Sequence, residues 1–163
     1  MISDGSTDLA VTVTFLNKTA TRHAEAMFLK LNPAAVSTME MHKIGSWIEL
    51  TEGLVVDGGN KAMHGVNGGV RFNHSAGAGA AATSMLLETL DAGVVVFGEP
   101  TGFPTSGPYG DQEPDLSKGV SSMMLNNLWG TNYVMWYPFE KEGQPVATPV
   151  KVYACKKTLA FCT

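Results

Sequence analysis

The chain has 163 residues, of which 44% are hydrophobic and 16% are charged, and its formal net charge is −4 at pH 7. This length and composition predict one globular domain and exclude an intrinsically disordered chain. The acidic balance argues against a protein that follows nucleic-acid phosphates, and no apolar run reaches the roughly 20 residues that a membrane helix needs. The start, MISDGSTDL, is polar and does not resemble a secretory signal, so we expect a cytoplasmic location for the chain as written.

Three short strands are predicted in the first third of the chain. In residues 8–17, leucine, valine and phenylalanine alternate with alanine and threonine, which is typical of a half-buried strand. Residues 25–33 predict a second strand, which ends at Asn32-Pro33 because proline cannot donate to a sheet ladder. Residues 42–50, HKIGSWIEL, predict a third short strand.

Glycine-rich turns divide the middle of the chain. Asp57-Gly58-Gly59-Asn60 lies between two apolar arms within residues 54–66, and glycine and asparagine tolerate the positive φ of a tight turn. We therefore predict a β-hairpin over this segment. A break at Asn67-Gly68-Gly69 precedes another apolar and polar stretch, VRFNH, at 70–74.

The remaining predicted elements are two loops and three strands. Residues 75–85 are small and weakly patterned, and residues 98–116 are rich in proline and glycine, so we predict a loop at each place. Between them, a turn precedes the apolar strand Val94 to Phe97, and two further strands are expected around Asn126 to Gly130. Seven or eight short strands without an amphipathic helix predict an all-β fold, an antiparallel β-sandwich.

No motif for a metal or a nucleophile is found in the sequence. There is no HExxH or GxSxG motif, and Cys155 and Cys162 are too few for a disulfide framework or a structural zinc site. We interpret them as incidental thiols near the C-terminus. Four histidines lack metal-ligand spacing and are interpreted as surface or hydrogen-bonded side chains: His23, His42, His64 and His74.

Acidic residues likewise show no pattern that identifies a glycosidase. Such an enzyme uses two carboxylates that flank the bond to be broken. Four candidates are available, and no sequence feature pairs any two of them, so we interpret each as structural or solvated: Glu25, Glu49, Asp57 and Asp91.

The aromatic stretch NNLWGTNYVMWYPF, residues 126–139, is the strongest candidate for a binding site. Its indole rings could stack on sugars while asparagine amides bind sugar hydroxyls. The same rings could equally pack against a neighbouring surface, and their spacing lets them point to both faces of a strand. Packing is the preferred interpretation, with sugar contact second.

Five stretches occur in an order that resembles an uncharacterised branch of the α-mannosidases of glycoside hydrolase family 38. They are NKTATRHAEAMFLKLNP (17–33), HKIGSWIEL (42–50), GGNKAMHGV (58–66), LDAGVVVFG (90–98) and NNLWGTNYVMWYPF (126–139). The first and the last are the most specific. The resemblance covers residues 8–139 and concerns the C-terminal β-rich part of those proteins.

This resemblance implies a supersandwich-like β-sandwich that packs beside a catalytic domain. Zinc and the carboxylate nucleophile of the α-mannosidases belong to that catalytic domain, so no catalytic residue, metal ligand or cofactor is carried over to this chain. What the resemblance implies here is a face toward the catalytic domain or toward carbohydrate. The residues expected on it are Arg22, Glu25, His64, Asn127, Trp129, Gly130, Thr131, Asn132 and Trp136.

Two departures from the family pattern affect the predicted domain boundaries. His23-Ala24 stands where an apolar residue and a proline are expected, and the sequence after Phe139 does not continue as the family does. We therefore predict one β-sandwich domain over 1–139 and a divergent, truncated or aberrantly joined tail over 140–163. A missing strand would leave an unpaired sheet edge.

The expected function is that of a non-catalytic β-sandwich portion of a family 38-like protein. It would support a mannosidase-like catalytic domain and have no hydrolase activity by itself. Two alternatives remain open: a free-standing carbohydrate-binding module that uses Trp129, Asn132 and Trp136, and an inactive truncated fragment. The expected partners are a catalytic domain or carbohydrate, and neither nucleic acid nor membrane.

Overall fold

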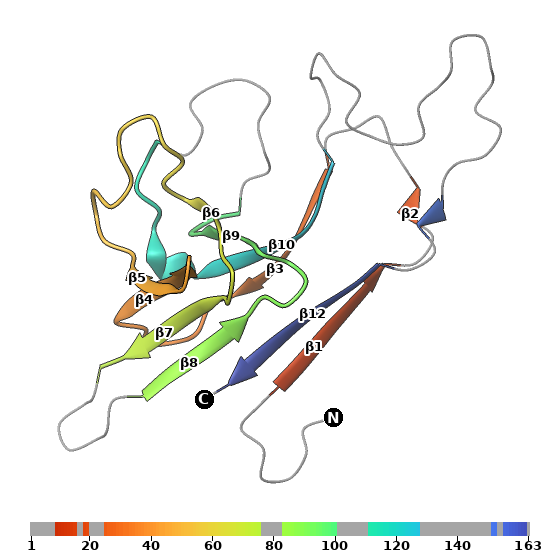
Figure 1. The fold of residues 1–163 in the computed structure, drawn as a ribbon, viewed down its shortest axis with the longest axis horizontal. Coiled ribbons are helices and arrows are strands. Elements are labelled where there is room, and N and C mark those ends of the chain that lie inside the picture. The colour runs from red at the N-terminus through yellow and green to blue at the C-terminus, as the bar shows by residue number, and fades with distance from the viewer. Residues whose placement is uncertain are drawn as a thin grey trace.

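The computed structural model describes residues 9–15, 18–19, 25–75, 83–100, 111–127, 151–152 and 155–162. Within these ranges the chain forms β-strands and one short 3-10 helix, without an α-helix, which confirms the predicted all-β fold (Figure 1). The elements are β1 (Leu9–Phe15), β2 (Lys18–Thr19), β3 (Glu25–Leu31), β4 (Thr38–Lys43), β5 (Ser46–Glu49), β6 (Met63–Gly65), β7 (Val70–His74), β8 (Thr83–Glu88), β9 (Val94–Phe97), η1 (Leu116–Lys118), β10 (Val120–Asn127), β11 (Lys151–Val152) and β12 (Cys155–Cys162).

Ten of these strands form two antiparallel sheets. The larger sheet has six strands in the order β1-β12-β8-β7-β4-β5, and the smaller has four in the order β3-β10-β9-β6. Strands β2 and β11 pair separately. The strand order mixes near and distant parts of the chain, so most of the pairing depends on contacts that are remote in sequence.

The two sheets bury a shared apolar core. Strands β4, β7 and β8 supply it from the larger sheet, and β9 and β10 supply it from the smaller one. Full burial of one large apolar side chain is worth about 1.5–3 kcal/mol, so this core is the main source of stability. Its buried members are Met39, Met41, Val66, Val70, Phe72, Leu87, Ala92, Val95, Phe97, Val120 and Met124.

Several strands lie where the sequence predicts them. Strand β1 lies within the predicted range 8–17, β3 lies within 25–33, and β9 has the predicted bounds, Val94–Phe97. Strand β10 is the first of the two strands predicted near residues 126–130. The second lies outside the described residues.

The strand predicted over 42–50 is wrong in its extent, because this segment contains a reversal of the chain. Lys43 ends β4, Ser46 begins β5, and the two strands pair antiparallel with Lys43 opposite Ser46. Ile44 and Gly45 make the turn with φ values of 49° and 78°. Isoleucine rarely adopts positive φ, which is why the sequence suggested a continuous strand.

The hairpin predicted over 54–66 is also wrong, although its turn is present. Gly58 has a φ of 83° and the Gly59 N–H donates to the Val56 carbonyl at 3.0 Å, as a tight turn requires. The residues before the turn form no strand, and β6 pairs instead with β9, which offers three register partners. Residues between β5 and β6 therefore form a long loop.

In two places the structure has a strand where the sequence predicted none. Strand β8 begins at Thr83, so the predicted loop at 75–85 is shorter at its end. Strand β12 lies between β1 and β8, in a segment where no strand was predicted because the family resemblance ends at Phe139. Every residue of β1, from Leu9 to Phe15, has a register partner in β12.

Candidate functional site

The residues expected on the interdomain or carbohydrate face are only partly within the described ranges. Glu25, His64 and Asn127 are described, and all three belong to the four-stranded sheet. The structure brings two of them together, because Asn127 at the end of β10 lies opposite Glu25 at the start of β3. The others lie outside the described residues: Arg22, Trp129, Gly130, Thr131, Asn132 and Trp136.

His64 lies apart from that pair. It is opposite Val95 of β9, and Val95 is opposite Ser122 of β10. Two strand spacings and five residues along β10 therefore separate His64 from Asn127, or about 20 Å at ordinary sheet dimensions. The expected face thus divides into two places, one at each edge of the four-stranded sheet.

The first place is the β3–β10 ribbon, which we define as Glu25–Phe28 paired with Met123–Asn127. Strand β10 pairs with β9 only through Val120–Ser122, whereas its pairing with β3 continues to Asn127, so the ribbon projects past β9 (Figure 1). The register shifts between Met123 and Leu125, and such a bulge bends a strand. A two-stranded ribbon is marginally stable alone in water, so it gains from packing against another surface.

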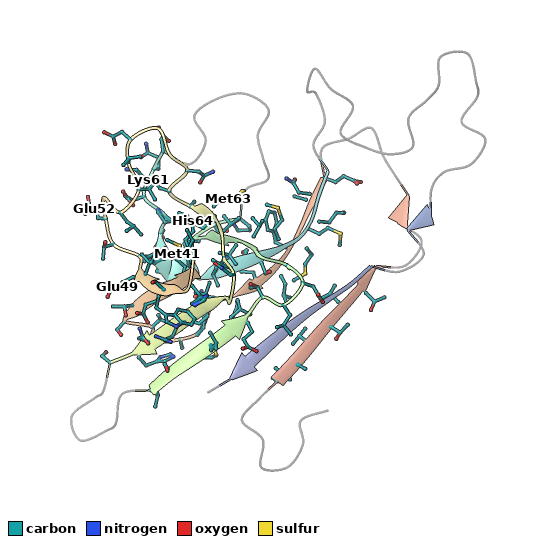
Figure 2. All side chains as sticks on the ribbon, in the orientation of Figure 1. Met41, Glu49, Glu52, Lys61, Met63 and His64 are labelled. Atoms are coloured by element: carbon teal, nitrogen blue, oxygen red, sulfur yellow. The ribbon has the colours of Figure 1, made fainter. Side chains whose placement is uncertain are left out.

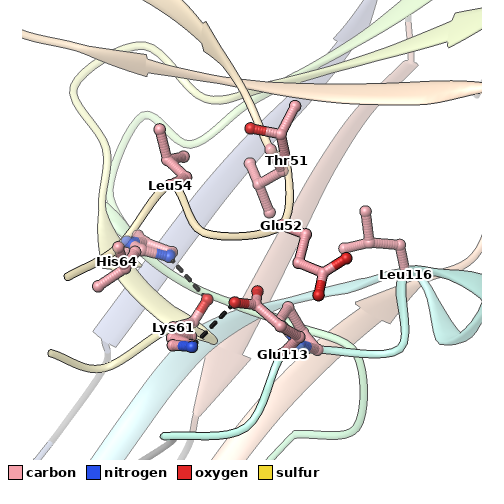
Figure 3. A pocket seen from close by; sticks show the side chains of 10 residues that line it. Thr51, Glu52, Leu54, Lys61, His64, Glu113 and Leu116 are labelled. Carbon is pink, nitrogen blue, oxygen red and sulfur yellow. Dashed lines mark hydrogen bonds and ion pairs between the residues drawn. The ribbon is translucent and has the colours of Figure 1, made fainter. Parts of the chain in front are cut away.

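The second place is a cavity of about 400 Å³ beside His64, which we name the edge pocket. The loop between β5 and β6 and the segment before η1 enclose it, near the edge strands of both sheets. Figure 2 shows Glu52, Lys61 and His64 at this end of the molecule. Its lining residues are Leu50, Thr51, Glu52, Leu54, Val55, Lys61, His64, Glu113, Pro114 and Leu116 (Figure 3).

An ion pair joins the two segments that enclose the edge pocket. The Lys61 Nζ atom lies 2.9 Å from Glu113 Oε1 (Figure 3). The Gly53 N–H donates to the same oxygen at 3.2 Å. The hydrogen bond with Glu113 raises the pKa of Lys61, and the bonds from Lys61 and Gly53 lower the pKa of the Glu113 carboxyl. Both groups are therefore charged at neutral pH, and they hold the loop against the segment.

His64 is buried at the inner end of the edge pocket. Its Nε2 atom lies 3.0 Å from the Lys61 carbonyl oxygen, which can only accept, so Nε2 carries the proton and donates it (Figure 3). The ring packs against Phe97 with 5.9 Å between ring centroids. Burial lowers the pKa of His64 below its ordinary value of 6.5, so the imidazole is neutral at pH 7.

Lys61, Glu113 and His64 in the edge pocket are joined by hydrogen bonds and an ion pair. Glu113 Oε1 already accepts two hydrogen bonds, and the His64 Nε2 proton is committed to the Lys61 carbonyl. We call Lys61, Glu113 and His64 the clamp, because their contacts hold the β5–β6 loop against the segment before η1 at one edge of the sandwich.

Sequence reasoning named His64 through the family resemblance and missed Lys61 and Glu113. The two residues of the ion pair lie in segments far apart in the chain, and no spacing in the sequence connects them. The one local signal is Asn60, whose Oδ1 accepts from the backbone N–H of Ala62 and Met63 and so fixes the chain just before β6.

Neither the described residues nor known proteins identify a ligand for this site. Within the described ranges, no three His, Cys, Asp or Glu side chains come together as metal ligands would, and no helix has the length and apolarity of a membrane span. No family model matches the sequence, and neither the curated proteins nor the solved structures include a match.

Proposed function

We propose that this chain is the non-catalytic β-sandwich portion of an α-mannosidase-like glycoside hydrolase and that it braces a catalytic domain outside these residues. One observation carries the proposal. Asn126 and Asn127, the described start of the specific stretch 126–139, pair in the β3–β10 ribbon with Ala26 and Glu25 of the other specific stretch, 17–33. Stretches that are distant in sequence and adjacent in space are expected of a shared contact surface.

The strand pairing and the exposed apolar surface of the ribbon favour its packing against another domain. Beyond Ser122, β10 has β3 as its only strand partner among the described residues, and a strand edge of this kind is a surface that a neighbouring chain can extend. Met27 on the ribbon is 42% exposed, which places apolar surface beside those edges. A docked domain would bury both and would stabilise the ribbon.

His64 is assigned to the clamp and not to the contact with the catalytic domain. The ribbon lies about 20 Å away across the sheet, and the His64 ring is buried with its Nε2 proton bonded to Lys61. The bracing surface is therefore narrower than the face that the resemblance implies.

An activity assay tests the non-catalytic part of the proposal. The purified chain is incubated with an aryl α-mannoside and zinc, and we expect no release of the aryl alcohol. Turnover that persists through repurification and changes with a substitution in this chain would contradict the proposal.

A binding assay tests the bracing part. A separately expressed catalytic domain of a family 38 α-mannosidase is titrated with the chain, and we expect a complex in size-exclusion chromatography. Met27→Lys should weaken it by at least about tenfold, because a charge would be buried in the contact. Leu90→Lys is the matched control, since Leu90 is 63% exposed and lies off the ribbon. Equal effects of the two variants would contradict this assignment.

A further inference from the structure

Strand β1 is the outermost strand of the six-stranded sheet, and one of its edges has no strand partner among the described residues. On its other side, every residue from Leu9 to Phe15 pairs with β12 in a continuous register. Figure 1 shows these two strands side by side at the end of the sheet. The open edge of β1 is therefore long and regular, which is the form that another strand extends most readily.

The sequence of β1 lacks the features that protect an edge strand from further pairing. Proteins protect such edges by short length, charged side chains, proline or a bulge. The seven residues LAVTVTF contain no charge and no proline, and their register with β12 has no shift. Four of the seven are valine or threonine, which favour strands. Nothing in this strand opposes the addition of a neighbour.

The other edge strands of the two main sheets, as far as the structure describes them, do carry such protection. Strand β5 has four residues and ends at the exposed Glu49, and β6 has only three residues. Strand β3 equals β1 in length, but it contains Glu25 and Lys30 and pairs with β10 through an irregular register. Strand β1 is therefore the one long and uncharged edge among them.

The two faces of β1 differ, and this difference restricts how a partner strand can lie. Ala10, Thr12 and Thr14 are exposed, whereas Val11 and Val13 are half-buried on the side of the core. A partner strand must therefore place apolar residues on the core side of the sheet and small or polar residues on the other side.

A second copy of β1 meets this requirement when it pairs antiparallel about Thr12. In that register Thr12 lies opposite the partner's Thr12 and Val11 lies opposite the partner's Val13, so each residue meets one from the same face. Neither strand brings a charge to the contact. Leu9, on the same face as Val11, is 40% exposed, so this side of the sheet still has apolar surface to cover.

Pairing through β1 also ends at two copies. The contact has two-fold symmetry and uses the unprotected edge of each copy. The joined sheet then has a β5 strand at each end, and β5 is short and carries Glu49. A closed dimer is therefore favoured over an open chain of copies.

From this arrangement we infer that β1 is the interface for a second copy of this chain, and that the two six-stranded sheets join into one antiparallel sheet about a two-fold axis at Thr12. One strand from each copy makes a small contact, so we expect a Kd between about 10 μM and 1 mM. The proposed bracing ribbon lies on the other sheet. Dimerisation therefore stands or fails independently of docking at the ribbon.

The first test is sedimentation equilibrium of the full chain at concentrations from about 10 μM to 1 mM. Thr12→Lys and Thr12→Glu should each raise the Kd of the dimer by at least about tenfold, because like charges then face each other across the axis. An equimolar mixture of the two variants should pair again with the wild-type Kd or a lower one. Ser46→Glu, at an exposed position on the opposite edge of the same sheet, should leave the dimer unchanged.

The second test reads the register directly. Opposed residues of an antiparallel pair have Cα atoms about 4.5–5.5 Å apart, which lies within the range that a disulfide spans. With Cys155→Ser and Cys162→Ser as the background, Thr12→Cys should form a disulfide-linked dimer in oxidised glutathione. Ser46→Cys in the same background should stay monomeric.

Circular dichroism checks the fold of each variant, and if a charged variant does not fold, the Thr12→Cys cross-link decides. A wild-type chain that stays monomeric at about 1 mM would overturn the inference. So would equal effects of Thr12→Glu and Ser46→Glu, or folded Lys and Glu variants that do not pair when mixed. Met27→Lys on the ribbon should leave the dimer intact, and dissociation by this variant would move the interface to the ribbon.

Discussion

The two faces of the six-stranded sheet use the same strands for opposite purposes. On β4 and β7 the inward residues Met39, Met41, Val70 and Phe72 are at most 3% exposed, and their outward neighbours are charged or polar and only partly covered. A difference of one residue in position therefore decides whether a side chain fills the core or meets solvent.

Substitutions on the two faces should therefore differ in their effect on stability. A change on the inner face removes apolar burial, whose cost is large and independent of any ligand. A change on the outer face removes hydrogen bonds that water can replace, so its effect on folding is small. Neighbouring residues of one strand can therefore be compared directly.

The largest expected effect is that of Phe72→Ala on the inner face. Phe72 has 0% of its surface exposed and belongs to the central core, so we expect a loss of about 3–5 kcal/mol in the free energy of unfolding. Asn73→Ala, one residue further and on the outer face, should cost about 1 kcal/mol or less. Urea unfolding of both variants measures the difference, and similar losses would contradict the two-face interpretation.

A change at the turn that joins β4 to β5 should stabilise the protein. Ile44 is 93% exposed and has a φ of 49°, a conformation that costs a residue with a side chain about 1–2 kcal/mol. Asparagine tolerates this conformation before glycine, so Ile44→Asn should raise the free energy of unfolding by about 1 kcal/mol. Ile48→Asn is the control, because Ile48 packs against the core and its loss should destabilise. A lower melting temperature for Ile44→Asn would contradict the strained turn.

A smaller effect is expected from the pH dependence of His64. Burial holds its pKa in the folded state below the ordinary value of 6.5, so in the window below pH 6.5 the unfolded state binds the proton first. Stability is therefore fully present above pH 6.5 and declines as the pH falls through this window. His64→Gln should show a smaller loss between pH 7.5 and 5.5 in urea unfolding.

Glu113→Gln is the control for the His64 measurement. The pKa of Glu113 is lowered below its ordinary value of 4.5, so the stability that it contributes is present above that value and is lost at lower pH. Between pH 7.5 and 5.5 this variant should keep the wild-type slope. A slope that flattens in Glu113→Gln and not in His64→Gln would contradict the assignment of the titration.

The sequence predicts those parts of the fold that local periodicity controls. The alternation in 8–17 and the apolar run at Val94–Phe97 identify β1 and β9, because burial on one or both faces repeats within the strand itself. Strand pairing depends on remote residues. The apolar arms of 54–66 suggested a local hairpin, yet β6 pairs with β9, and β12 pairs with β1 from the far end of the chain.

The candidate site and other side-chain contacts show the same limit. Glu40 lies outside the predicted strand at 42–50 and no strand face was predicted for Arg71, and only the register of β4 against β7 makes them partners. The Lys61–Glu113 ion pair likewise requires that the β5–β6 loop meet the segment before η1. The spacing of residues within one element does not indicate contacts between distant parts of the chain. The sequence therefore identified His64 but not Lys61 and Glu113, which lie beside it in the edge pocket.

The smallest expected effect compares two ion pairs with the same N–O distance of 3.1 Å. One joins Arg71 to Glu40 on the six-stranded sheet, and the other joins Lys30 of the four-stranded sheet to Glu99. Partly exposed pairs contribute about 0–1 kcal/mol, so Glu40→Gln and Glu99→Gln should both stay within about 1 kcal/mol of the wild type in urea unfolding. Glu40→Gln should cost more, because Oε2 of Glu40 also accepts from Asn73 and its side chain is 21% exposed, against 66% for Glu99. A loss above about 2 kcal/mol in Glu40→Gln would mean that the hydrogen bonds among Glu40, Arg71 and Asn73 hold these strands together.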